Sequence, residues 1–145
     1  MEIRAVLETW GASAAAANAT TEEIESMTAC LEAMSRARNA GRIGHELNVR
    51  LHFLISSASR NRFLVHIMVT ISAWIERVTR KVYAASSDER AIQDQLLAQH
   101  TAIVDAIRSG DSPAASRAMA RHLRYAEETV RRTGPPPASP ETDPS

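Results

Sequence analysis

Residues 109–113, Ser-Gly-Asp-Ser-Pro, form a turn signal between two long stretches of helical periodicity, and this turn limits how the C-terminal half can fold. Glycine favours a helix end and proline is tolerated in the first turn of the next helix, so we predict a helical hairpin. His100 lies ten residues before Gly110 and His122 twelve residues after it. At about 1.5 Å per residue, both histidines lie roughly 15 to 18 Å from the turn, and therefore level with each other in an antiparallel pair.

The two histidines also fall on the apolar faces of their helices. His100 completes the i, i+4, i+7 spacing of one apolar stripe, and His122 falls within the other. Both imidazoles are therefore expected to face the core, where an unpaired polar group costs roughly 1 to 3 kcal/mol. The stripes consist of Leu96, Ile103, Val104 and Ile107 before the turn, and of Ala115, Ala118, Met119, Ala126 and Val130 after it.

The rest of the chain shows helical spacing and no strand pattern. A capping box of Thr20 and Glu23 opens one helix, and Gly41 is suited to end it. We predict an all-α antiparallel bundle of about six helices over residues 1–133, followed by a disordered tail over 134–145 that holds five of the six prolines. The predicted helices cover residues 3–18, 20–38, 43–57, 62–84, 87 or 88 to 110, and 113–133.

A third histidine, His52, lies on or beside an apolar face of the helix predicted at 43–57, with Asn48 one turn earlier on the same side. Three inward imidazoles on three helices, with an amide oxygen nearby, suit a divalent transition metal. The alternative is that each histidine is an ordinary core residue with its own hydrogen bond, and geometry alone does not decide between the two. We expect His45, near a helix start, to be solvated, and Trp74 to lie in the core or to border a cavity.

Composition argues against several classes of protein. The formal net charge is zero, whereas a DNA-binding domain usually shows a basic surplus. Cys30 is the single cysteine, so no internal disulfide or thiolate zinc cluster can form. No apolar run approaches the roughly 18 to 20 residues that span a bilayer, and the acidic, amphipathic N-terminus is unlike a signal peptide. A soluble cytoplasmic protein that does not bind membranes is expected.

Three segments, in this order and at this spacing, resemble the FCD domain, the C-terminal effector-binding domain of FadR-type regulators in the bacterial GntR family. The resemblance covers about residues 2–130. Where the family has an Asp-x-x-x-His motif, this chain has Asn48 and His52. The three segments are "RAVLETWGASAAAANAT", "NVRLHFLISSASRN" and "QHTAIVDAIRSGDSPAASRAMARHL".

The resemblance implies a helical bundle that holds a divalent metal beside a cavity for a small molecule. The family's ligands, an Asp and three His, map onto Asn48, His52, His100 and His122. The amide of Asn48 can coordinate but brings no negative charge, so we expect a lower metal affinity; Zn, Ni, Mn and Fe all remain possible. The resemblance also assigns Arg4 to an effector carboxylate, and the alternative for Arg4 is a salt bridge to the glutamate four residues later.

We therefore expect a metal-dependent sensing domain for a small organic acid, part of a GntR/FadR-type transcriptional regulator, homodimeric and not an enzyme. Such regulators begin with a winged helix-turn-helix domain that is missing from this sequence, so we expect no direct DNA binding by this chain alone. One alternative is a metal-dependent enzyme using the three-histidine site. Against it, no inward Asp or Glu is expected beside the histidines as a general base. The other alternative is a structural dimerisation module.

Overall fold

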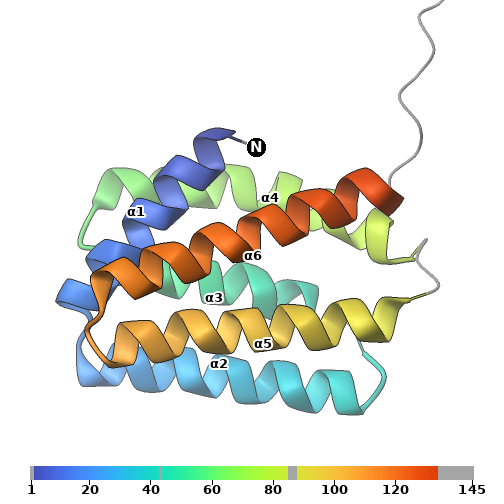
Figure 1. The fold of residues 1–145 in the computed structure, drawn as a ribbon, viewed down its shortest axis with the longest axis horizontal. Helices are drawn as coiled ribbons and strands as arrows, with labels where there is room; N and C mark the ends of the chain where they lie inside the picture. The colour runs from blue at the N-terminus through green and yellow to red at the C-terminus, as the bar shows by residue number, and fades with distance from the viewer. Residues whose placement is uncertain (1, 43, 85–87, 134–145) are drawn as a thin grey trace, which may run out of the picture.

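The computed structural model describes residues 2–42, 44–84 and 88–133, and it confirms an all-α bundle of six helices in this part of the chain (Figure 1). The predicted tail over 134–145 lies outside the described residues. The predicted helix ends agree with the observed ones to within two residues. The helices are α1 (Glu2–Asn18), α2 (Thr21–Asn39), α3 (His45–Ala58), α4 (Arg62–Ala84), α5 (Glu89–Arg108) and α6 (Ser112–Thr133).

Local signals in the sequence set the helix ends. The Thr20 side chain accepts a hydrogen bond from the backbone N–H of Glu23, and the Glu23 side chain accepts one from the backbone N–H of Thr20. This is the predicted capping box at the start of α2. Gly41 and Gly110 follow α2 and α5 with φ of 68° and 69°, a conformation that costs other residues free energy because of the Cβ atom. The Asn61 side chain accepts two backbone N–H bonds at the start of α4. Of the successive helices, α2 packs on α3, α3 on α4 and α5 on α6, whereas α1 packs on α6 and α3 rather than on α2.

The helices pack as a bundle in which α5 and α6 form the predicted antiparallel hairpin (Figure 1). Helix α1 lies against α6 and α3, while α2 packs on α3 and α5. Small side chains on α1 allow these close approaches. The central core includes Ala12, Ala15, Met27, Leu51, Ile55, Ile103, Val104, Ile107 and Met119.

Helix α4 covers one side of the bundle, where it packs mainly on α3 (Figure 1). The expectation that Trp74 lies in the core is wrong, because this side chain is 55% exposed, whereas Leu64, Met68 and Ile75 on the inner face of α4 are buried. Helix α1 approaches α4 closely at Gly11, where a Cβ atom would lie 2.8 Å from the Leu64 side chain. The large exposed apolar side chains of the described residues belong to α1, α3 and α4: Ile3, Val6, Trp10, Phe53, Phe63, Val69 and Trp74.

Within the described ranges, no helix combines enough length with enough apolar character to cross a bilayer.

Candidate metal centre and adjoining cavity

Three buried histidines from three helices meet at the centre of the bundle. His52 comes from α3, His100 from α5 and His122 from α6, and each side chain is at most 3% exposed. One ring nitrogen of each lies within 4.8 Å of the other two. The hairpin places His100 and His122 level, as the sequence predicts, with ring centroids 4.3 Å apart.

The separation of the His52 and His122 ring nitrogens fits a divalent ion, and one nitrogen of His100 lies within 4.8 Å of both. Nε2 of His52 lies 3.2 Å from Nε2 of His122. Two imidazole nitrogens that bind one Zn²⁺ at 2.0–2.1 Å are about 3.3 Å apart when their angle at the ion is tetrahedral. His100 is fully buried, and neither of its ring nitrogens has a hydrogen-bond partner within the described residues. An imidazole buried without a partner is costly, and coordination of an ion would satisfy it.

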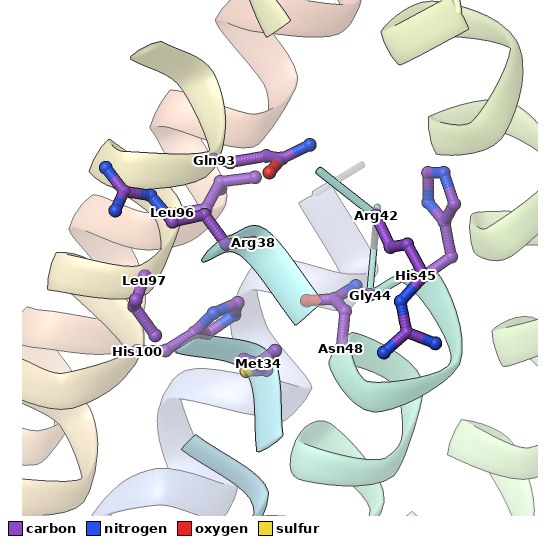
Figure 2. A pocket seen from close by; sticks show the side chains of 10 residues that line it. All are labelled: Met34, Arg38, Arg42, Gly44, His45, Asn48, Gln93, Leu96, Leu97 and His100. Carbon is purple, nitrogen blue, oxygen red and sulfur yellow. The ribbon is translucent and has the colours of Figure 1, made fainter. Parts of the chain in front are cut away.

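Asn48 lies beside these histidines, one turn before His52 on α3. Its amide reaches into a cavity whose opposite wall is formed by α5, and in Figure 2 it is turned toward His100. The amide oxygen is therefore placed where a fourth ligand could come from. That Asn48 coordinates an ion stays a prediction.

The cavity lies between α2, α3 and α5, and His100 of the histidine cluster forms part of its wall (Figure 2). Its volume is about 60 Å³, enough for roughly five water molecules. His100 belongs both to the histidine cluster and to the cavity wall, so a ligand in the cavity would lie beside the cluster. The lining residues are Met34, Arg38, Arg42, Gly44, His45, Asn48, Gln93, Leu96, Leu97 and His100.

The two arginines of the cavity wall differ in whether their guanidinium groups are already paired with another residue. The Arg38 guanidinium is paired with Asp94 of α5 and also donates to Asn39. The Arg42 side chain is exposed, and its guanidinium makes no hydrogen bond or ion pair with any other described residue. Arg42 is therefore the cationic group that a ligand in this cavity could recruit without breaking an existing ion pair.

A buried carboxylate also touches the histidine cluster, and the sequence analysis missed it. Glu8 of α1 is 3% exposed, and it accepts one hydrogen bond from Nδ1 of His52 and another from Nε of Arg4. The expectation that no inward acid neighbours the histidines is therefore wrong. The sequence pattern indicates an inward position for Glu8, because this residue shares its helical face with Ala12 and Ala15, four and seven residues later.

Arg4 lies away from the cavity. It is buried, it pairs with Glu8 as the i, i+4 alternative anticipates, and it is not among the residues that line the cavity beside His100. Instead it contacts the Nδ1 side of His52 through Glu8, whereas the cluster is formed by the Nε2 side. This geometry connects Arg4 to the histidines through Glu8, and its contact with an effector stays a prediction.

Two further side chains complete the surroundings. Gln99 Oε1 accepts a hydrogen bond from Nδ1 of His122 at 3.2 Å, a contact that the sequence left open. The expectation that His45 is solvated is wrong, because this side chain is 8% exposed and lines the cavity. Burial and the nearby Arg80 lower the pKa of His45.

Burial and charge shift the titration of the cluster. Burial raises the pKa of Glu8, but His52 and Arg4 outweigh it and bring the pKa down to about 2. Burial moves the pKa of His100 well below its usual range, and the neighbouring Arg4 guanidinium lowers it further. The pKa of His122 is lowered well below that range, chiefly by burial and next by His100. Near neutral pH, His100 and His122 are therefore neutral and able to bind a metal, and Glu8 is ionised.

These shifts predict that the metal-free protein loses stability on mild acidification. Unfolded histidines titrate near pH 6.5, whereas folded His100 and His122 stay neutral to a lower pH, so below 6.5 the unfolded state binds more protons. Each histidine should then remove about 1.4 kcal/mol of stability per pH unit as the pH falls from 6.5 toward its folded pKa. Melting in chelator between pH 7.5 and 5.5 measures this loss.

The matched variants are His100→Leu and His66→Leu. The first removes one buried titrating group and should flatten the pH dependence, while the second changes an exposed histidine and should leave it as in the parent protein. A melting temperature of the parent protein that does not change over this range would contradict the burial of neutral imidazoles.

Comparison with known proteins relates this geometry to a family. The FCD domain family matches residues 1–125. The chain is 29% identical over 133 residues to the HTH-type transcriptional regulator LutR of Bacillus subtilis, and 30% identical over 137 residues to a "Putative L-lactate dehydrogenase operon regulatory protein" of Escherichia coli. These alignments cover 90% and 91% of this chain, but only 60% and 50% of the two relatives.

Solved structures show the same fold. A GntR protein of Streptococcus agalactiae superposes with a TM-score of 0.73 at 23% identity, over 90% of this chain and 56% of that one. McbR/YncC of Escherichia coli superposes with a TM-score of 0.78 at 16% identity, over 90% and 62% of the two chains. The family match covers most of the six-helix bundle, including all three clustered histidines. This chain belongs to the FCD domain family, the effector-binding domains of GntR-type transcriptional regulators.

Proposed function

We propose that this chain senses a small carboxylate through one divalent metal ion bound by His52, His100 and His122, with Asn48 as a weaker fourth ligand. The observation that carries the proposal is His100, which is buried between the histidine cluster and the cavity with both ring nitrogens unsatisfied by any described residue. A ligand in the cavity would lie within reach of both His100 and Asn48 (Figure 2).

The charge of the site favours an anion. The three imidazoles and the amide are neutral donors, and the one carboxylate in contact with the cluster, Glu8, is balanced by Arg4. A divalent ion bound there would supply a Lewis-acidic positive charge for a carboxylate or hydroxyl oxygen. With no carboxylate ligand from this chain to neutralise it, that charge would attract an anionic effector more strongly.

The size and lining of the cavity limit the effector. A volume of about 60 Å³ suits an acid of few non-hydrogen atoms, and Leu96, Leu97 and Met34 offer apolar contact for its carbon chain. The Escherichia coli relative is named for an L-lactate dehydrogenase operon, which favours a short hydroxy acid here as well. Arg4 was the expected contact for a second acidic group, and Arg42 is better placed for that role.

Glu8 is the one acid in contact with the clustered histidines in the described part of the chain, but its position does not suit the general base that the enzyme alternative requires. A general base must reach the reacting group, but the Glu8 carboxylate is bonded to Nδ1 of His52 and to Arg4, on the side of the ring away from Nε2. Glu8 is also absent from the cavity wall. The relatives are transcriptional regulators, so we propose a cytoplasmic sensing role without catalysis.

The first prediction from this proposal concerns the metal. After incubation with Zn²⁺ or Ni²⁺ and desalting, elemental analysis of untagged protein should find about one ion per chain. His100→Ala should abolish this binding, because two imidazoles and an amide are too few to hold the ion. Asn48→Asp should tighten binding, because it adds a negative charge.

The control for the metal prediction is His66→Ala, which changes an exposed histidine outside the cluster and should bind like the parent. Less than about a tenth of an ion per chain in the parent protein would refute the metal site. An unchanged affinity in Asn48→Asp would remove Asn48 from the set of ligands.

The second prediction concerns the effector. Short hydroxy acids and dicarboxylates should raise the melting temperature of the metal-loaded protein but not of the chelator-treated protein. At about a hundred times the dissociation constant the gain is roughly 2.7 kcal/mol. Arg42→Gln should weaken dicarboxylates more than monocarboxylates, while Arg36→Gln, an exposed residue of α2 outside the cavity lining, should change neither. Equal stabilisation with and without metal would show that the ion does not contact the effector.

The third prediction concerns the partner. We propose a homodimer through the exposed apolar side chains of α1 and α4, because Val6 and Trp10 on α1 and Phe63 and Trp74 on α4 are at least half exposed. A contiguous apolar patch on a soluble domain commonly marks an interface. Sedimentation at micromolar concentration should show a dimer, and Trp74→Glu should shift it toward the monomer. Ala98→Glu, at an exposed position on α5, should not. A monomeric parent protein would refute this interface.

A further inference from the structure

Burying the carboxylate of Glu8 at its position costs solvation free energy. Its carboxylate is 3% exposed at the centre of the bundle, where it pairs with the Arg4 guanidinium and accepts a hydrogen bond from Nδ1 of His52. The other described ion pairs join side chains that are far more exposed. A buried ion pair contributes little net stability compared with well-packed apolar residues, so stability alone does not account for Glu8.

The contact between Glu8 and His52 determines which ring nitrogen faces the cluster. An ionised carboxylate can only accept, so Nδ1 of His52 must carry the hydrogen of this bond. In the neutral ring Nε2 then has a free lone pair, and this is the nitrogen that faces His122 at 3.2 Å. The opposite tautomer would place a hydrogen on Nε2, where it would block coordination.

Arg4 holds the carboxylate in place for this contact. The guanidinium bonds Oε1 of Glu8, which leaves Oε2 for His52. Both Arg4 and Glu8 lie on one turn of α1, so the position of this helix is tied to the ring of His52 on α3. The three histidines differ in this respect: His122 has the neutral acceptor Gln99, and His100 has no acceptor among the described residues.

We propose that Glu8, held by Arg4, is a positioning residue that fixes His52 in the Nδ1–H tautomer and turns Nε2 toward the metal, coupling α1 to the metal centre. This inference rests on the proposed function for the metal, but its tautomer part concerns the metal-free protein as well. Acceptors on the far nitrogen of a metal-binding histidine orient the ring and raise its basicity, and their loss commonly weakens metal binding 10- to 100-fold.

The experiment compares two double variants that differ only in the acceptor at residue 8. Arg4→Met/Glu8→Gln keeps an amide oxygen for Nδ1–H, and Arg4→Met/Glu8→Leu removes the acceptor; both replace the buried ion pair with neutral side chains of similar size. Long-range ¹H–¹⁵N spectra of the full chain in chelator report the tautomer of His52. Zn²⁺ titration then gives the dissociation constant, and Gln99→Leu serves as the corresponding change beside His122.

The parent and the glutamine variant should show His52 with hydrogen on Nδ1 and should bind Zn²⁺ within a few fold of each other. The leucine variant should show a mixed or reversed tautomer and bind Zn²⁺ about 10- to 100-fold more weakly. A leucine variant that keeps both the tautomer and the affinity overturns the inference. If that variant does not fold, the parent spectrum still decides, because hydrogen on Nε2 of His52 overturns it directly. A parent protein that binds no Zn²⁺ but shows the Nδ1–H tautomer refutes the metal site and leaves the tautomer assignment standing.

Discussion

The burial of three imidazoles at one level of the bundle is the constraint on which the rest of this structure depends. Neutral imidazoles can be buried only if their nitrogens find partners, and here the partners differ for each ring: a carboxylate for His52, an amide for His122 and none of the described residues for His100. The remaining nitrogens point toward one another. A cation at their centre would give each of the three rings a partner for one nitrogen.

The hairpin of α5 and α6 shows how much of this arrangement the sequence can predict. The turn signal around Gly110, the similar spacings of ten and twelve residues to His100 and His122, and two apolar stripes predict the level and direction of both rings. His52 needed more, because spacing on α3 gives its face but not its level relative to the hairpin. The family resemblance supplied that information, and the structure brings the three rings together.

The residues that the sequence analysis missed share a physical reason. A charged residue such as Glu8 is normally assigned to solvent, so its position on the alanine-rich face of α1 was interpreted only as an ion pair with Arg4. Trp74 was placed in the core from its apolar character, although an apolar residue is also expected at an interface between chains. Periodicity shows which residues share a face, but it does not show what covers that face.

Asn48 connects the charge of the site to its proposed ligand specificity. If a carboxylate occupied this position, it would offset half of the ion's charge and compete with an acidic effector for it. An amide leaves that charge for the effector, at the cost of weaker metal binding. Glu8 can compensate for part of that cost from the far side of His52, because a carboxylate on Nδ1 strengthens the imidazole as a ligand without occupying a coordination position. The negative charge would then act through His52, and the position beside Asn48 would remain open to the cavity.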